Sequence, residues 1–132
     1  MSETSVKHIR TPLARVRGRG AAHSGTDHFW RQRLTAVANI PLTIAAIIIV
    51  ITLLGRNQPA VAQILGSPLV AVIMLLFIVS NTIHMKIGMQ VIIEDYVHGE
   101  TVKLVLIMAN TFFCIAVALA SVYGIFKLSF GV

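Results

Sequence analysis

The chain has 132 residues, of which 56% are hydrophobic and only 12% are charged, and its mean hydropathy is +0.82. A soluble domain is about 25% charged, and a chain this short cannot bury so much apolar surface in a core of its own. Disordered chains combine low hydrophobicity with high charge. The composition therefore excludes a soluble enzyme and a disordered chain, and it predicts an all-α integral membrane protein.

The first 33 residues form a basic segment that we predict to be a cytoplasmic tail. Seven of the 11 Lys and Arg residues lie in it, and the net charge of +6 comes mainly from there. This asymmetry indicates membrane orientation rather than nucleic-acid binding. The apolar run that begins near Leu34 is too long for a secretory signal peptide. A mitochondrial transit peptide, which is also Arg-rich and poor in acids, is the alternative.

Three apolar segments long enough to cross a bilayer follow the tail, at residues 34–54, 66–93 and 104–126. Pro41 in the first is expected to kink the helix or to lie where a neighbour satisfies the carbonyl that it frees. The second is expected to continue as a helix past Lys86, because nothing breaks it there. Polar connections at 55–59 and 94–100 complete a three-helix membrane domain over residues 34–132.

The distribution of Lys and Arg predicts the orientation of these three spans. The tail carries seven of these residues and the second connection adds Lys103, whereas the first connection carries only Arg56 and the C-terminal end only Lys127. Positive charge accumulates on the cytoplasmic side. We therefore expect a cytoplasmic N-terminus and a periplasmic C-terminus.

The second segment carries a polar face centred on His84. On a helical wheel of about 100° per residue, four further residues lie within about 60° of it: Ser80, Asn81, Gly88 and Asp95. Because polar groups are costly in hydrocarbon, this face is expected to meet a partner, a cofactor or a cavity. A neutral imidazole is a good iron ligand, and Gly88 leaves room for a flat porphyrin. One interpretation is therefore axial ligation of a haem by His84, packed by Gly88 and Ser80, with the second ligand from another chain.

Other interpretations stay open on the residues alone. His84 can instead form a hydrogen bond to a neighbouring helix, worth about 1 kcal/mol, or belong to a proton relay. Asp95 and Tyr96 lie at the end of the same helix, about 16 Å along its axis from His84. A tyrosine hydroxyl donates well to a quinone carbonyl, and a carboxylate relays protons. The alternative is an interfacial tyrosine beside a solvated carboxylate.

Three helices with short connections leave no room for a separate active-site domain, so no catalytic residue is predicted. Any chemistry has to take place between helices or against a partner chain. Cys114 is the single cysteine, which excludes an internal disulfide and a cysteine cluster for zinc or iron–sulfur. The spans show no inverted repeat of the kind found in transporters.

The stretch Ile83–Met89, followed by Asp95-Tyr96-Val97, resembles the signature of the small hydrophobic membrane anchor of succinate dehydrogenase, respiratory complex II. In that family a haem-ligating His is followed by Gly after four residues and by an Asp-Tyr pair after eleven. Gly25–Val37 resembles the entry into the family's first helix, and Tyr123–Val132 resembles its short C-terminus. The resemblance covers about residues 18–132.

The resemblance implies a haem b between His84 and a histidine of a companion anchor subunit. It also implies that Tyr96 donates a hydrogen bond to ubiquinone, while Asp95 pairs with a partner arginine and helps to deliver protons. Arg33 is expected to neutralise a haem propionate, with Arg31 as the competing candidate, and either can instead bind lipid phosphate. Lys86 lies about 200° round the helix from His84 and is expected to point away from the haem.

The function implied is that of a non-catalytic membrane anchor of succinate:quinone oxidoreductase. Such a subunit docks a flavoprotein and an iron–sulfur subunit, which feed electrons from succinate to ubiquinone, in the bacterial or alternatively the mitochondrial inner membrane. One rival is a small homo-oligomeric transporter or channel with His84 and Asp95 as a proton relay. A second rival is an anchor that has a quinone site but no haem.

Overall fold

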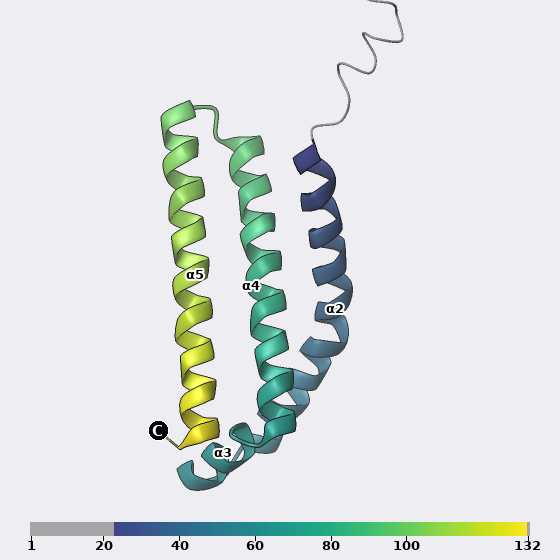
Figure 1. Ribbon diagram of the computed structural model, residues 1–132, viewed down its shortest axis with the longest axis vertical. Helices are drawn as coiled ribbons and strands as arrows, with labels where there is room; N and C mark the ends of the chain where they lie inside the picture. Colours follow the sequence, from purple (N-terminus) through teal and green to yellow (C-terminus); the bar gives the residue numbers. More distant parts are fainter. Residues whose placement is uncertain (1–22, 132) are drawn as a thin grey trace, which may run out of the picture.

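The computed structural model describes residues 23–131, and in that range it contains four helices and no strand. The helices are α2 (His23–Leu53), α3 (Gln58–Leu65), α4 (Pro68–Tyr96) and α5 (Glu100–Phe130) (Figure 1). Three of them, α2, α4 and α5, are long and apolar enough to cross a membrane. The predicted all-α fold with three candidate transmembrane helices is confirmed. Residues 1–22, most of the predicted basic tail, lie outside the described residues.

Helix α2 begins at His23, well before the apolar segment that starts at Leu34. The last part of the predicted tail is therefore helical. Its first turns carry exposed charges, including an ion pair between Arg31 and Asp27 with 3.4 Å between nitrogen and oxygen, one helical turn apart. Such turns lack the apolar periodicity from which a helix is predicted, so the helix extends beyond the apolar span that the sequence indicated.

The polar turn that the sequence indicated for residues 55–59 is present at residues 54–57, and a short helix follows it before α4. The chain turns at Gly55, which has a positive φ of 73°, and α3 then begins at Gln58. The Asn57 side chain caps α3 by accepting a hydrogen bond from the backbone N–H of Ala60 at 3.2 Å. Pro59 occupies the first turn, where no backbone donor is needed. A helix of eight residues shows too little periodicity to stand out from its polar flank.

Helix α4 continues past Lys86 as expected and ends only at Tyr96. Its last turn therefore includes Glu94 and Asp95, which the sequence placed in a connection over residues 94–100. Only residues 97–99 join α4 to α5. The polar residues at this point extend the helix, and the Gln90 side chain donates a hydrogen bond to the Glu94 carboxylate one turn later at 2.8 Å.

The long helices form a single layer in which α4 lies between α2 and α5 and packs against both (Figure 1). The lower part of α2 turns behind α4 in this view, and Pro41 lies inside α2, where proline bends a helix. Few apolar side chains of the described residues are buried within the layer: Ala46, Ile49, Ala71, Ile87, Ile93 and Cys114. Most apolar side chains are exposed on the two faces of the layer, where lipid or another chain can cover them.

The first turns of α2 and the α4–α5 connection lie at the same end of the layer, and α3 lies at the opposite end (Figure 1). The basic residues Arg31 and Arg33 are therefore near the end at which Tyr96 closes α4. The prediction that this end faces the cytoplasm stays a prediction.

Candidate functional site

The polar face of α4 packs directly against α2. The hydroxyl oxygen Oγ1 of Thr35 lies 3.2 Å from Nδ1 of His84, and the Ser80 hydroxyl donates to the backbone carbonyl oxygen of Thr35 at 3.4 Å. Thr35 is the one buried polar residue among those described, and His84 is half-buried. The sequence left open whether His84 forms a hydrogen bond to a neighbouring helix or binds a cofactor. Its Nδ1 contacts the neighbouring helix α2 through Thr35. The hydrogen bonds of the described residues leave its second ring nitrogen, Nε2, unused.

Gly88 lies on the same face, one turn beyond His84. Gln32 of α2 covers it, because a Cβ atom on Gly88 would lie 3.5 Å from the Gln32 amide nitrogen. The Gln32 oxygen Oε1 is buried without a hydrogen-bond partner among the described residues. Asn81 bonds within its own helix, donating to the carbonyl oxygen of Phe77 at 2.9 Å. Helix packing thus accounts for the space beside Gly88, and its role against a porphyrin stays a prediction.

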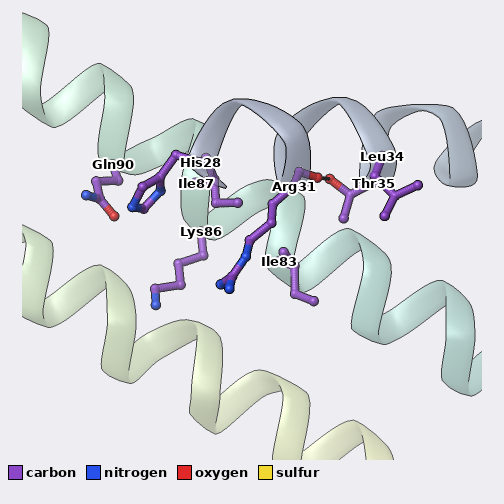
Figure 2. A pocket seen from close by; sticks show the side chains of 8 residues that line it. All are labelled: His28, Arg31, Leu34, Thr35, Ile83, Lys86, Ile87 and Gln90. Carbon is purple, nitrogen blue, oxygen red and sulfur yellow. Dashed lines mark hydrogen bonds between the residues drawn. The ribbon is translucent and has the colours of Figure 1, made fainter. Parts of the chain in front are cut away.

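A cavity of about 330 Å³ opens beside this contact, between α2 and α4. Arg31 from α2 and Lys86 from α4 both extend into it, with His28 and Gln90 at one end and Thr35 toward the other (Figure 2). No carboxylate lines this cavity, and Asp27, which pairs with Arg31, lies outside the lining. Lys86 lies on a different side of α4 from His84, as the helical wheel indicates, but it shares this cavity with Arg31.

Arg33 lines a second cavity, of about 410 Å³, together with Phe29, Gln32 and Val91. Its guanidinium carbon lies 4.5 Å from the centre of the Phe29 ring, a cation–π contact. The two candidate arginines therefore line different cavities. Arg31 has an additional cation beside it, whereas Arg33 has an aromatic ring.

Asp95 and Tyr96 are together in the last turn of α4, and both side chains are exposed. Tyr96 is 77% exposed. Neither residue lines either of the two cavities between α2 and α4. A quinone pocket at this end of the layer therefore needs walls from another chain.

In the range that the structure describes, no three His, Cys, Asp or Glu side chains gather into a metal cage. A haem needs fewer protein ligands than a metal ion bound by side chains alone, because the porphyrin supplies four donors and the protein adds only the axial ones. His84 offers one imidazole whose Nδ1 is held by α2 and whose Nε2 is unused. This donor set fits one axial position of a haem iron.

Sequence reasoning missed two residues of α2, Thr35 and Gln32, as parts of this site. A threonine and a glutamine at the start of an otherwise apolar segment were the available signal. Which residues of α4 they contact depends on the position of α2 along the axis of α4, and no local sequence pattern determines that position. On the other side of α4, Asn110 of α5 donates to the carbonyl oxygen of Lys86 at 3.0 Å and so fixes the α4–α5 contact.

Comparisons of the sequence with known proteins found one matching family profile and several named relatives. The family profile of the succinate dehydrogenase/fumarate reductase transmembrane subunit matches residues 7–120. The succinate dehydrogenase hydrophobic membrane anchor subunit of Paracoccus denitrificans is 34% identical over 121 residues, which cover 92% of this chain and 93% of that protein. The corresponding subunit of Rickettsia bellii is 29% identical, over 89% of this chain and 94% of that protein. The succinate dehydrogenase membrane anchor subunit of Reclinomonas americana is 35% identical over 62% of this chain. No solved structure matches significantly.

Proposed function

Since the chain belongs to the succinate dehydrogenase/fumarate reductase transmembrane subunit family and serves as a membrane anchor of succinate dehydrogenase, we propose that it supplies one axial ligand of a haem b and part of a ubiquinone site. The transporter alternative has no support in the names of its relatives. An anchor subunit works with catalytic subunits and a membrane, so both sites are shared with other chains.

The observation that carries the haem proposal is the orientation of His84. Thr35 engages Nδ1 at 3.2 Å, and His84 is half-buried. A bound haem supplies an iron that takes up and gives back one electron at a time. His84 on α4 would hold that iron through Nε2, while Thr35 on α2 holds Nδ1.

The single-layer fold is an argument that a companion chain covers part of this subunit. The faces of α2, α4 and α5 that are not in contact with each other leave large apolar side chains exposed. The three apolar segments of the sequence hold no other histidine, so a second histidine ligand would have to come from a companion anchor subunit, as the family resemblance implies. We assign the catalytic partners as a flavoprotein subunit and an iron–sulfur subunit.

The haem propionates need positive charge near the edge of the ring. Arg31 and Lys86 extend into one cavity that no carboxylate lines, and this pair of cations favours Arg31 over Arg33 as the propionate contact, although Arg31 would have to exchange its exposed ion pair with Asp27 for the propionate. Arg33 is engaged on the Phe29 ring, 4.5 Å away. Lys86 adds a second cation to this cavity. The helical wheel of α4 alone could not show that Lys86 lies in the same cavity as Arg31.

Tyr96 and Asp95 form this chain's part of the quinone site. Tyr96 projects from the end of α4, where its hydroxyl is free to donate to a quinone carbonyl in a pocket completed by partner chains. Reduction of a quinone to the quinol takes two protons. Asp95, exposed beside Tyr96, is suited to accept protons from the aqueous side and pass them on.

We place the complex in a bacterial inner membrane with the Tyr96 end toward the cytoplasm. The relatives from Paracoccus denitrificans and Rickettsia bellii are bacterial proteins. The basic residues of α2 lie at the same end of the layer as Tyr96, in accordance with the preference of Lys and Arg for the cytoplasmic side.

Purification of the affinity-tagged chain in mild detergent tests this proposal. We expect succinate-oxidising subunits to co-purify, and a dithionite-reduced minus oxidised spectrum to show a sharp low-spin b-type haem band. An intact assembly with succinate activity and a flat spectrum would identify a haem-free anchor and overturn the haem assignment. A chain that purifies without any partner would contradict the assigned partners.

A further inference from the structure

We propose that Thr35 is a positioning residue for the haem ligand, which selects the tautomer of His84 that leaves Nε2 free to bind iron. This inference rests on the proposed haem site and deepens it. Thr35 lies on α2 and His84 on α4, 49 positions apart in the sequence, so only the packing of the two helices brings them together.

The direction of the hydrogen bond follows from the number of protons available. The Thr35 hydroxyl has one proton, and its closest acceptor is the backbone carbonyl oxygen of Arg31 at 2.7 Å, with the carbonyl oxygen of Gln32 at 3.1 Å. Both acceptors belong to its own helix, and neither can donate. The hydroxyl proton is therefore used within α2, and the oxygen faces His84 as an acceptor.

An accepting Thr35 oxygen requires a proton on Nδ1 of His84. A neutral imidazole carries only one proton, so Nε2 then has a free lone pair, which is the state that a metal ligand needs. The same bond fixes the rotation of the ring. The Ser80 hydroxyl, which donates to the Thr35 carbonyl oxygen at 3.4 Å, holds the two helices in register at this point.

The contact also influences the iron. A ligating histidine that donates its other N–H to an acceptor is a stronger electron donor, and removal of such an acceptor commonly weakens metal binding by about 10- to 100-fold. A stronger donor stabilises the ferric state and so lowers the reduction potential. Without the Thr35 hydroxyl, the potential is expected to rise and haem to be held less tightly.

The test compares Thr35→Val with Thr82→Val in the purified detergent-solubilised complex. Valine keeps the shape of threonine and removes the hydroxyl. Thr82 is the matched control, because its hydroxyl bonds only a carbonyl oxygen of its own helix, that of Ile78 at 2.7 Å. The measurements are haem per assembled complex, the rate of haem loss after dilution, and the midpoint potential from a redox titration of the b-type band.

We expect Thr35→Val to show a more positive potential and at least about tenfold faster haem loss on dilution, while Thr82→Val matches the wild type. Thr35→Ser, which keeps the hydroxyl, is expected to restore both values. Should Thr35→Val not assemble, Thr35→Ala removes the hydroxyl without requiring space and gives the same comparison.

A wild-type potential and normal haem retention in Thr35→Val would overturn this inference alone, because a role in packing is satisfied by valine. A Thr35→Ser variant that behaves like Thr35→Val would overturn it as well. A wild-type complex without haem would instead overturn the proposed function and this inference together, so the two failures are distinguishable.

Discussion

The side-chain amide nitrogen of Gln32 lies 3.5 Å from the point that a Cβ atom on Gly88 would occupy. This distance is an ordinary van der Waals contact, so the two helices meet here without strain. Together with the contact between Thr35 and His84 one turn away, it makes this part of the α2–α4 interface the place where the proposed ligand is held. A larger side chain at Gly88 would have to displace Gln32.

We expect Gly88→Ala to leave haem content close to the wild-type value and Gly88→Leu to reduce it clearly. An added methyl group meets Gln32 at a normal distance, whereas leucine separates α2 from α4 at a cost of about 1–3 kcal/mol. Haem per complex and thermal stability in detergent measure this effect. Gly124→Leu is the control, because a Cβ atom there has nothing within 4 Å. A Gly88→Leu complex with normal haem content would contradict the described packing.

Gly66 offers a test of the fold that is independent of any cofactor. A Cβ atom at Gly66 would lie 2.6 Å from the backbone carbonyl oxygen of Leu128 in α5 and 2.9 Å from that of Ala62. Backbone atoms cannot move aside as a flexible side chain does. We therefore expect Gly66→Ala to destabilise the α3–α5 contact by about 1–3 kcal/mol and to lower the melting temperature. Gly124→Ala, in open space on α5, is expected to have no such effect, and equal melting temperatures would disprove the close approach of α3 to α5.

Tyr96→Phe tests the proposed quinone contact. The variant removes only the hydroxyl, so quinone reduction is expected to fall by about two- to tenfold, because a hydrogen bond to a neutral carbonyl contributes about 0.5–1.5 kcal/mol. Succinate oxidation with an artificial acceptor is expected to stay normal, since that reaction does not use the membrane site. Tyr123→Phe, at an exposed tyrosine of α5, is the control. A parallel loss of both activities would make Tyr96 a structural residue.

The three long helices were predictable because each contains an apolar run long enough for a membrane, and local composition is enough to detect such a run. The start of α2 at His23 and the short helix α3 were missed. In both places polar residues interrupt the apolar pattern, although Asn57 followed by Pro59 is a helix-start signal that is present in the sequence. The continuation of α4 past Lys86 followed from the absence of any breaker.

The candidate site was only half predictable. The residues on α4, His84 and Gly88, share one helix face, and helical periodicity is sufficient to find them. Thr35 and Gln32 belong to α2, and their positions opposite that face are set by the packing between helices. The sharing of one cavity by Arg31 and Lys86 likewise depends on how α2 and α4 are placed relative to each other.

The central claim is that Nε2 of His84 binds the haem iron, and the most direct measurement is the haem content of a His84→Ala complex. The reduced-minus-oxidised spectrum is recorded on wild-type and variant complexes with equal amounts of every subunit. We predict a sharp low-spin b-type band in the wild type and its loss, or conversion to a high-spin form, in His84→Ala. An unchanged low-spin band at wild-type stoichiometry would contradict the assignment of His84 as the axial ligand.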